Sequence, residues 1–434
     1  MADGDVNISI DETVKGLLNS VQNRSPIDLF STSINIVPSG LRDLSPSSFI
    51  PRVVSIGPLH KENENLKAFE DQKATYVHEL LHPLDSPVEQ TLKECVLKVA
   101  FSVDRIRASY VPKITYSDME LAKMMVMDAC FILGFIGALS ESSDEPELQY
   151  LLRGSSIVYD LVLVENQIPF FILQDIFDCT ILKSKPTASL TDLILQLIQV
   201  FNVFQSNITI SNVYPFVPLD HILGFLDRCY WPSVEYSPSQ GLPSSAIHST
   251  VELERAGMIF QCNQDHERWQ MDMEFISSKF SCFSWCWGKP TLRMPVLRID
   301  NFTELILRNL IAYEQSSGFR TYVTSYAMAM DMLVDNQEDI AKLIDSKVVV
   351  NHLGSNEKAA NMMNSLCKEL PLLSFYYIDI WRQMDTHYNS YWPKNISALK
   401  RTYFSSPWNM IALLAGIALF ALTIVQTIYT VNAA

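Results

Sequence analysis

The segment from Thr402 to Ala434 contains no charged side chain, and Met410 to Tyr429 within it is predicted to form one membrane-spanning helix. About 20 residues at 1.5 Å each match a hydrocarbon layer of about 30 Å. Trp408 and Tyr429 lie near its two ends, where aromatic rings favour the headgroup zone. We therefore expect a single-pass membrane anchor over residues 408–430.

Basic side chains flank this predicted span on one side: Lys394, Lys400 and Arg401 precede it and none follows it. The positive-inside bias then places the residues before the span in the cytosol. The start of the chain, MADGDVNISIDETV, is acidic and has no apolar signal region. The expected topology is a tail anchor with a cytosolic body, in which Asn-x-Ser/Thr tripeptides stay unglycosylated. The sequence does not indicate which membrane is involved.

Composition limits the classes of function that remain. The formal net charge is -15, which argues against a nucleic-acid-binding surface, because phosphate binding needs a local excess of Lys and Arg. The eight cysteines are spread over 434 residues and form no dense disulfide framework. A hydrophobic fraction of 48% with only 14 glycines indicates a compact helical protein.

The chain is predicted to be mainly α, with three regions. Residues 1–48 are polar and then rich in Ser and Pro, which predicts a flexible leader. Residues 49–400 are predicted to form one large helical body. Within it, β-branched and aromatic residues alternate between about 257 and 300, which predicts a small antiparallel β insertion.

Helical spacing recurs along the body. One helix is predicted from Val88 to Tyr110 and a long one from about Leu373 to Leu399. Ser117 followed by Glu120 forms a capping-box pattern that opens a third helix. Because this third helix is apolar nearly all round, it is either a core element or a second membrane pass. Met124 to Leu139 is short for a span, so we favour a core helix.

No common catalytic signature occurs in the chain: G-x-S-x-G, the P-loop, a strand-linked G-x-G-x-x-G and H-E-x-x-H are all missing. A catalytic site assembled from distant residues remains an alternative. The sequence predicts a non-catalytic protein without a cofactor.

One cysteine and histidine pattern resembles a metal site. Cys262 and His266 form C-x3-H, and Cys282 and Cys286 form C-x3-C 15 residues later. Thiolates and imidazole at such spacing could complete a tetrahedral zinc site. Zinc pairs on turns usually have the tighter C-x2-C spacing, however, and strand alternation alone explains residues four apart. The core interpretation is therefore favoured over a zinc-supported scaffold.

Three carboxylates lie within apolar sequence: Asp128, Asp160 and Glu165. A desolvated carboxylate has a raised pKa unless it is paired, and general acids are made in this way. Such residues more often form structural ion pairs or cap helices, and Arg105 and Arg107 are expected as partners. We favour the structural interpretation, with an enzyme of unknown reaction as the alternative.

The predicted anchor contains features that favour self-association. Ala412 and Gly416 are one helical turn apart, and Gln426 and Thr427 follow. Small residues let two membrane helices approach closely, and a buried Gln can hydrogen-bond across the contact. Alanine-rich spans show this spacing often, so the pattern is a weak signal.

The chain contains a series of distinctive blocks in a fixed order: SIGPLH from Ser55, DQK from Asp71, MMVMDACFIL, DLVLVENQIPFFIL from Asp160 to Leu173, STVELERAGMIF, LRIDNFTELILRNLIAYEQ from Leu297 to Gln315, and YFSSPWNMIALLAG. In these blocks the chain resembles a plant-specific family known as domain of unknown function 247. The resemblance implies a helical plant protein anchored at its C-terminus, of undefined biochemistry. It also suggests recognition or signalling with an unidentified protein partner, including reproductive roles in self-incompatibility or sex determination.

The most specific block contains Glu165, Asn166 and Gln167 before Ile168 and Pro169. Proline suits the first turn of a helix, so Pro169 is predicted to begin a new one. Three polar side chains between apolar runs fit a tight corner in which the amides satisfy free backbone groups. A binding loop is the competing interpretation, and the corner is favoured.

Overall fold

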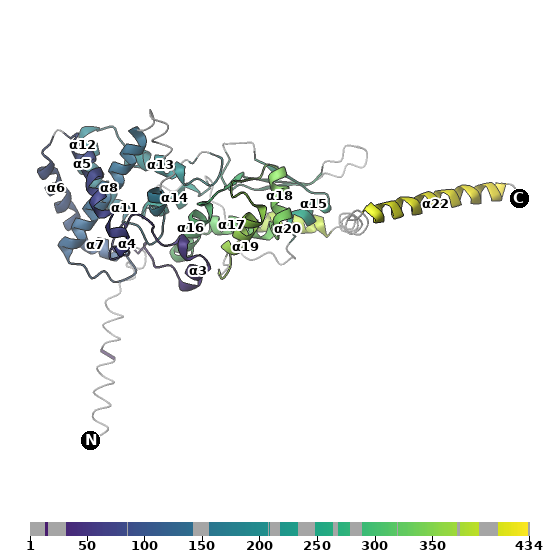
Figure 1. Ribbon diagram of the computed structural model, residues 1–434, viewed down its shortest axis with the longest axis horizontal. Helices are drawn as coiled ribbons and strands as arrows, with labels where there is room; N and C mark the ends of the chain where they lie inside the picture. The colour runs from purple at the N-terminus through teal and green to yellow at the C-terminus, as the bar shows by residue number, and fades with distance from the viewer. Residues whose placement is uncertain are drawn as a thin grey trace, which may run out of the picture. The chain divides into compact units, whose positions relative to one another are not determined.

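The computed structural model describes residues 14–15, 32–84, 86–141, 156–206, 208, 218–232, 248–263, 268–277, 289–318, 320–370, 374–389 and 407–432. Over these residues the chain is mainly helical with short strands, as the sequence predicts (Figure 1). It divides into two compact units. Unit 1 comprises Met1–Asn202, Ile208–Trp231 and Leu305–Arg320, and unit 2 comprises Val203–Asn207, Pro232–Glu304 and Thr321–Ala434.

Unit 1 is built from helices alone among its described elements. These are α3 (Ser39–Leu44), the 3-10 helix η1 (Pro46–Ser48), α4 (Glu64–Lys67), α5 (Glu70–Leu81), α6 (Val88–Ala100), α7 (Val103–Ala108), α8 (Asp118–Glu141), α10 (Ser156–Asp160), α11 (Phe170–Cys179), α12 (Ile181–Ser184), α13 (Leu190–Val200), α14 (Ile222–Cys229) and most of α16 (Thr303–Ser317). The predicted helix from Val88 to Tyr110 is interrupted, because the chain turns at Phe101 and Ser102 between α6 and α7.

Helix α8 is the centre of unit 1. It packs against α5, α6, α11 and α13, which explains why its sequence is apolar on nearly every face (Figure 1). The predicted capping box is confirmed: the Ser117 N–H donates to Glu120 Oε2 at 2.9 Å, and the Glu120 N–H donates to Ser117 Oγ at 3.4 Å. Phe131 of α8 makes edge-to-face contacts with Phe69 and Tyr76, with ring centroids 5.7 and 5.3 Å apart.

One stretch of the described chain, Asp118–Leu139, is long and apolar enough to cross a membrane. Of this stretch 78% is buried inside the protein, which favours the core interpretation of α8. The apolar run Leu414–Ile428 near the C-terminus is shorter.

Unit 2 combines helices with two small sheets. Its elements are α15 (Thr250–Arg255), β1 (Ile259–Cys262), β2 (Glu274–Ile276), β3 (Thr291–Met294), β4 (Leu297–Ile299), α17 (Tyr322–Leu333), α18 (Gln337–Asp345), β5 (Val349–Asn351), α19 (Asn356–Leu366), α20 (Ile378–Tyr388) and α22 (Pro407–Asn432). The long helix expected from Leu373 to Leu399 is described only as α20, and residues 390–406 lie outside the described part.

The prediction of an antiparallel insertion within residues 257–300 is wrong in two respects. The first sheet has the order β1-β3-β2 and is mixed, because β1 runs parallel to β3 and β2 antiparallel to it. In the second sheet β4 pairs in parallel with β5, which lies near residue 350. A parallel pair needs a long crossover, and the helices between β4 and β5 provide it.

Helix α22 spans 26 residues, and its role as a membrane anchor stays a prediction. Its described apolar side chains are exposed, including Leu414, Leu419, Phe420 and Leu422 at 58 to 70%. Apolar side chains that line a helix without burial mark a surface that binds other apolar matter.

We expect Gly134→Ala to destabilise the protein by about 1–3 kcal/mol, the usual cost of overpacking a core. A Cβ at Gly134 in α8 would lie 2.5 Å from the backbone oxygen of Tyr76 in α5, so the two helices would have to separate. Gly137 on the same helix is the matched control, because a Cβ there meets no atom within 4 Å. Gly137→Ala should leave stability unchanged or raise it by up to about 1 kcal/mol through helix propensity.

Denaturant unfolding of both variants beside the natural protein measures the two effects. Equal stability of Gly134→Ala and Gly137→Ala would contradict the close helix contact.

Candidate functional site

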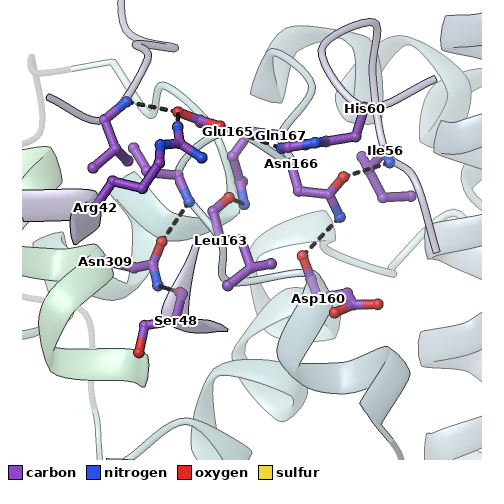
Figure 2. Close-up of polar contacts among 12 residues, drawn as sticks. Arg42, Ser48, Ile56, His60, Asp160, Leu163, Glu165, Asn166, Gln167 and Asn309 are labelled. Atoms are coloured by element: carbon purple, nitrogen blue, oxygen red, sulfur yellow. Dashed lines mark hydrogen bonds and ion pairs between the residues drawn. The ribbon is translucent and has the colours of Figure 1, made fainter. Parts of the chain in front are cut away.

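Polar residues that the sequence singles out lie buried in unit 1, and Figure 2 shows four of them, Asp160, Glu165, Asn166 and Gln167. Asp128, Asp160, Glu165, Asn166 and Gln167 are all at most 4% exposed. Three of them, Asp128, Asp160 and Asn166, bind residues 52–57, an irregular segment that is buried from Val54 onward. We call these five side chains the polar centre. Because this segment has no strand or helix of its own, its backbone groups need partners from side chains.

Asp160, at the end of α10, accepts three consecutive backbone hydrogen bonds. The N–H groups of Arg52, Val53 and Val54 donate to its carboxylate at 2.9, 2.7 and 2.9 Å. Burial raises the pKa of Asp160, and the three hydrogen bonds offset only part of that effect. The Asp160 carboxylate thus accepts hydrogen bonds that, in a sheet, the carbonyls of a neighbouring strand would accept.

Asn166 contacts the same segment from the following loop. Its Oδ1 accepts the N–H of Ile56 at 2.7 Å, and its Nδ2 donates to the carbonyls of Val54 at 3.0 Å and Asp160 at 2.9 Å (Figure 2). One amide therefore joins residues 54–56 to the end of α10.

Gln167 closes the loop on itself. Its Nε2 donates to the carbonyls of Leu161 and Leu163, each at 2.8 Å, and its Oε1 accepts the N–H of Leu223 at 3.3 Å. Pro169 is the N-cap residue of α11, which begins at Phe170. These contacts are the ones that a structural corner requires.

Gly57 brings the two segments into close contact. Its φ is +72°, a conformation that side chains other than glycine rarely adopt, and a Cβ would lie 2.6 Å from the Gln167 carbonyl oxygen. The Gly57 N–H donates to Asp128 Oδ2 at 2.8 Å. Glycine is therefore required both by its backbone conformation and by the lack of space.

Asp128 of α8 pairs with Lys73 of α5, whose Nζ lies 2.6 Å from Oδ1. Lys73 is 0% exposed and also contacts Glu70 and the carbonyl of Ser55. Burial acts to lower the pKa of Lys73, but Asp128 and Glu70 outweigh it and raise the pKa above its usual value. The pair is an ion pair closed off from solvent.

The prediction that Arg105 and Arg107 pair with the buried carboxylates is wrong. The Arg105 guanidinium lies over the ring of Phe171, 3.7 Å from its centroid. Arg107 donates to the carbonyls of Ile114 and Tyr116 at 2.7 and 2.6 Å. Sequence spacing placed the arginines in a neighbouring helix but did not show toward which side they point.

Glu165 binds the segment that precedes residue 49. Its Oε1 accepts the N–H of Val37 at 2.7 Å and forms an ion pair with Arg42, while His60 Nε2 lies 3.4 Å from Oε2 (Figure 2). Burial acts to raise the pKa of Glu165, but His60, Val37 and Arg42 together lower it. Val37 and Arg42 belong to the region that the sequence analysis assigns to the leader.

Asn309 of α16 is a member of the site that sequence reasoning missed. It is fully buried, its Oδ1 accepts the N–H of Val164 at 2.9 Å, and its Nδ2 donates to the carbonyls of Ser48 and Leu305 at 2.7 and 2.8 Å (Figure 2). Lys73 was missed as well. The sequence did contain a signal for Asn309 and Lys73, because each lies within a block that carries the family resemblance.

The sequence analysis also missed a second buried polar group in unit 1, which contains Asp227. Burial raises the pKa of Asp227, in α14, to about 7, and its carboxylate accepts the indole N–H of Trp231 at 2.9 Å. Glu314 of α16 lies within hydrogen-bonding reach and lowers this pKa.

The candidate zinc ligands are only partly described. Cys262 ends β1 and is half-buried, whereas His266, Cys282 and Cys286 lie outside the described residues. Within the described ranges, no group of three or more His, Cys, Asp or Glu side chains is placed to hold a metal ion. The core interpretation, which the sequence favours over the zinc alternative, stays a prediction.

The side chains of the polar centre form hydrogen bonds with backbone groups that have no partner in a helix or a sheet. The oxygens of Asp128, Asp160 and Glu165 accept hydrogen bonds from fixed donors and are shielded from solvent. A general acid must reach a substrate within hydrogen-bond distance, and a partner-binding loop must be exposed. The geometry therefore favours the structural corner over a binding loop.

We expect Lys73→Met to cost about 3–5 kcal/mol of unfolding free energy, because Asp128 would be left as a buried charge without its counter-ion. Adding Asp128→Asn should recover part of the loss. Lys67→Met is the control: Lys67 pairs with Glu64 at the surface, where such pairs contribute little. Denaturant unfolding measures all three variants, and an unfolding midpoint for Lys73→Met equal to that of the control would contradict the role of the pair.

Glu165→Gln should lower stability by about 1–3 kcal/mol at pH 7, since hydrogen bonds to a charged group are lost. The folded state lowers the pKa of Glu165 below its ordinary 4.5, so its contribution is present above that pH and disappears as pH falls through the folded pKa. The stability difference between the two proteins should shrink below about pH 4.5. A difference that is constant from pH 7 to pH 3.5 would show that the charge does not matter.

Comparisons with known proteins agree with the resemblance noted from the sequence. The model of a family described as plant protein of unknown function, DUF247, matches residues 34–422. The UPF0481 protein At3g47200 of Arabidopsis thaliana is 25% identical over 429 residues, covering 90% of this chain and 84% of that protein. The putative UPF0481 protein At3g02645 of the same plant is 22% identical, covering 95% and 93%. No solved structure matches the chain. The chain belongs to the plant DUF247 family, whose function is unknown.

Proposed function

We propose that this protein is a non-catalytic recognition protein, held on a membrane by α22 and facing the cytosol. The observation that carries the proposal is the exposed apolar surface of α22. Its 26 residues include no charged side chain, and at 1.5 Å per residue they extend about 39 Å. This length exceeds the roughly 30 Å of a hydrocarbon layer.

The flanking sequence supports the orientation. Lys394, Lys400 and Arg401 precede α22, and cytosolic flanks carry such basic residues. Thr423 and Thr427 donate their hydroxyls to the carbonyls of Leu419 and Thr423 at 2.8 Å. Their hydroxyls are thus satisfied within the helix, as a lipid environment requires.

The non-catalytic part of the proposal rests on the polar centre. Each of the three carboxylates that the sequence singles out, Asp128, Asp160 and Glu165, binds backbone N–H groups or a buried lysine. The enzyme alternative would need other residues. A recognition role follows because the signature residues maintain the fold, which leaves the exposed surface to contact a protein partner.

The reproductive roles that the resemblance suggests, self-incompatibility or sex determination, are compatible with such a protein. Recognition of a protein partner inside the cell needs a specific surface and a fixed location, and no turnover of substrate.

The test is a fractionation and protease experiment on microsomes from plant cells that express the full chain. The natural protein should remain in the membrane after alkaline carbonate extraction. Replacing Leu414 and Leu422 by Arg should release it, since each central charge costs about 2.5–3.5 kcal/mol on insertion. The control replaces the same two leucines by Val, which keeps the helix apolar.

Protease added without detergent should digest the body of the natural protein. Extraction of the natural protein by carbonate would contradict the anchor. Protection of the body without detergent would instead contradict the cytosolic orientation while leaving the anchor intact.

A further inference from the structure

Three free cysteines from different helices lie near one another in the core of unit 1. Cys95 belongs to α6, Cys130 to α8 and Cys179 to the end of α11, and these three helices pack against one another. A buried cysteine usually serves as a small apolar residue, and its reactivity decides whether it does more. The contacts of each thiol are therefore what distinguishes packing from chemistry.

Cys95 and Cys179 form a pair within this group. Their thiols lie within hydrogen-bonding reach of each other, whereas Cys130 acts on both only through electrostatic interaction. A disulfide needs a bond of about 2.05 Å between two sulfur atoms on side chains that point toward each other. Thiols in hydrogen-bonding contact already point toward each other, so rotation of the side chains and a small helix shift can close the remaining gap.

Ion pairs hold α6 beside α11 and α12 at the level of these two thiols. Lys98 of α6 lies 3.2 Å from Asp175 and 3.1 Å from Asp178 of α11. Lys183 of α12 pairs with Glu94 of α6. Glu94 precedes Cys95 directly and Lys98 follows it by three residues. The folded protein therefore keeps the two thiols next to each other.

Cys179 is the member of the pair that an oxidant reaches first. It is 8% exposed, whereas Cys95 is 0% exposed. Burial raises the pKa of Cys179, while Lys98, Cys95 and Lys183 act to lower it. Burial raises the pKa of Cys95 to about 12. Because the thiolate is the nucleophile, Cys179 reacts before Cys95, and it reacts slowly because its pKa stays above the ordinary value.

We propose that Cys95 and Cys179 form a disulfide when hydrogen peroxide oxidises the protein, which joins α6 covalently to α11. The Cys179 thiolate attacks one oxygen of the peroxide and the O–O bond breaks. The departing hydroxide takes up the proton that the thiol released, so that a sulfenic acid and one water are formed. The Cys95 sulfur then attacks the sulfenic sulfur, the S–O bond breaks, and the hydroxyl leaves with the Cys95 proton as a second water. The two thiols lose two hydrogens in total, and the peroxide is reduced to two waters.

The cytosolic location proposed above makes such a bond a response to oxidation. Cytosolic thiols are normally kept reduced, and the disulfides that do form there are usually transient or redox-sensing. Thiolates exchange with disulfides, so a dithiol reductant reverses the reaction. Because the cross-link can be measured on purified protein, its test does not depend on the membrane anchor or on the orientation of the body.

The experiment maps cross-links in the full chain, reconstituted in lipid nanodiscs and treated with hydrogen peroxide. The remaining thiols are alkylated in denaturant, and the chain is digested with trypsin without reduction. Trypsin cuts after Lys and Arg, so it places the three cysteines in separate peptides: residues 94–98 for Cys95, 124–153 for Cys130 and 154–183 for Cys179. Mass spectrometry should find the first peptide joined to the third, two hydrogens lighter than their sum. Dithiothreitol should abolish this species.

Two variants separate the steps. In Cys95→Ala the sulfenic acid of Cys179 lacks its partner, so dimedone, which traps sulfenic acids, should label Cys179 more strongly than in the natural protein. Cys229→Ala is the matched control. Cys229 is also buried, at 1% exposed, but belongs to α14 and contacts Asp227 and Arg228 instead of another thiol. This variant should form the cross-link as the natural protein does.

A chain unfolded in urea before oxidation gives the reference for random pairing. The proposal is overturned if the native chain shows no cross-link between Cys95 and Cys179, or if cross-links to Cys130 are equally abundant. The same distribution of cross-links in the native and the unfolded chain would also overturn it. If Cys95→Ala does not fold, the comparison of the native and the unfolded chain decides the outcome.

Discussion

Unit 1 depends on how a buried irregular segment satisfies its backbone. Residues 52–57 lie against the core without a sheet partner, and each unsatisfied N–H there would cost about 1–3 kcal/mol. Asp160, Asn166 and Asp128 together accept five of these N–H groups, while Lys73 and Asn166 donate to two of the carbonyls. The charge of the carboxylates makes these bonds stronger than bonds between neutral groups, which offsets the cost of burying them.

In unit 2, too, a buried carboxylate accepts hydrogen bonds from backbone N–H groups. Asp339 in the first turn of α18 is 0% exposed and accepts the N–H groups of Asp335 and Asn336, each at 3.1 Å, within a capping box. It also accepts the N–H of Val251 at 2.8 Å, which joins the start of α15 to the start of α18. Asp160, Glu165 and Asp339 are thus buried carboxylates that serve as hydrogen-bond partners for the backbone. Their presence in apolar sequence is not evidence of catalysis.

Local signals predicted local structure well. The capping box of α8, the break at Pro169 and the mainly helical class all follow from residue types within a few positions of each other. The partners of the buried carboxylates are distant in sequence. Residue spacing alone therefore did not show that Asp128 pairs with Lys73 and not with Arg105. Strand β5 was missed because three residues show no periodicity, and only its pairing with β4 gives it a structure.

The contact between Asn309 and Ser48 joins residues 261 positions apart within one unit. A ribosome therefore completes most of unit 1 long before α16, which supplies Asn309, has been synthesised. Until then the Val164 N–H and the Ser48 carbonyl lack their native partner, and the loop that carries the family signature is not closed. Such distant contacts slow folding, because the entropy of closing the chain is lost before the contact forms. Unit 1 consequently cannot complete its native contacts before the chain has been synthesised beyond Asn309.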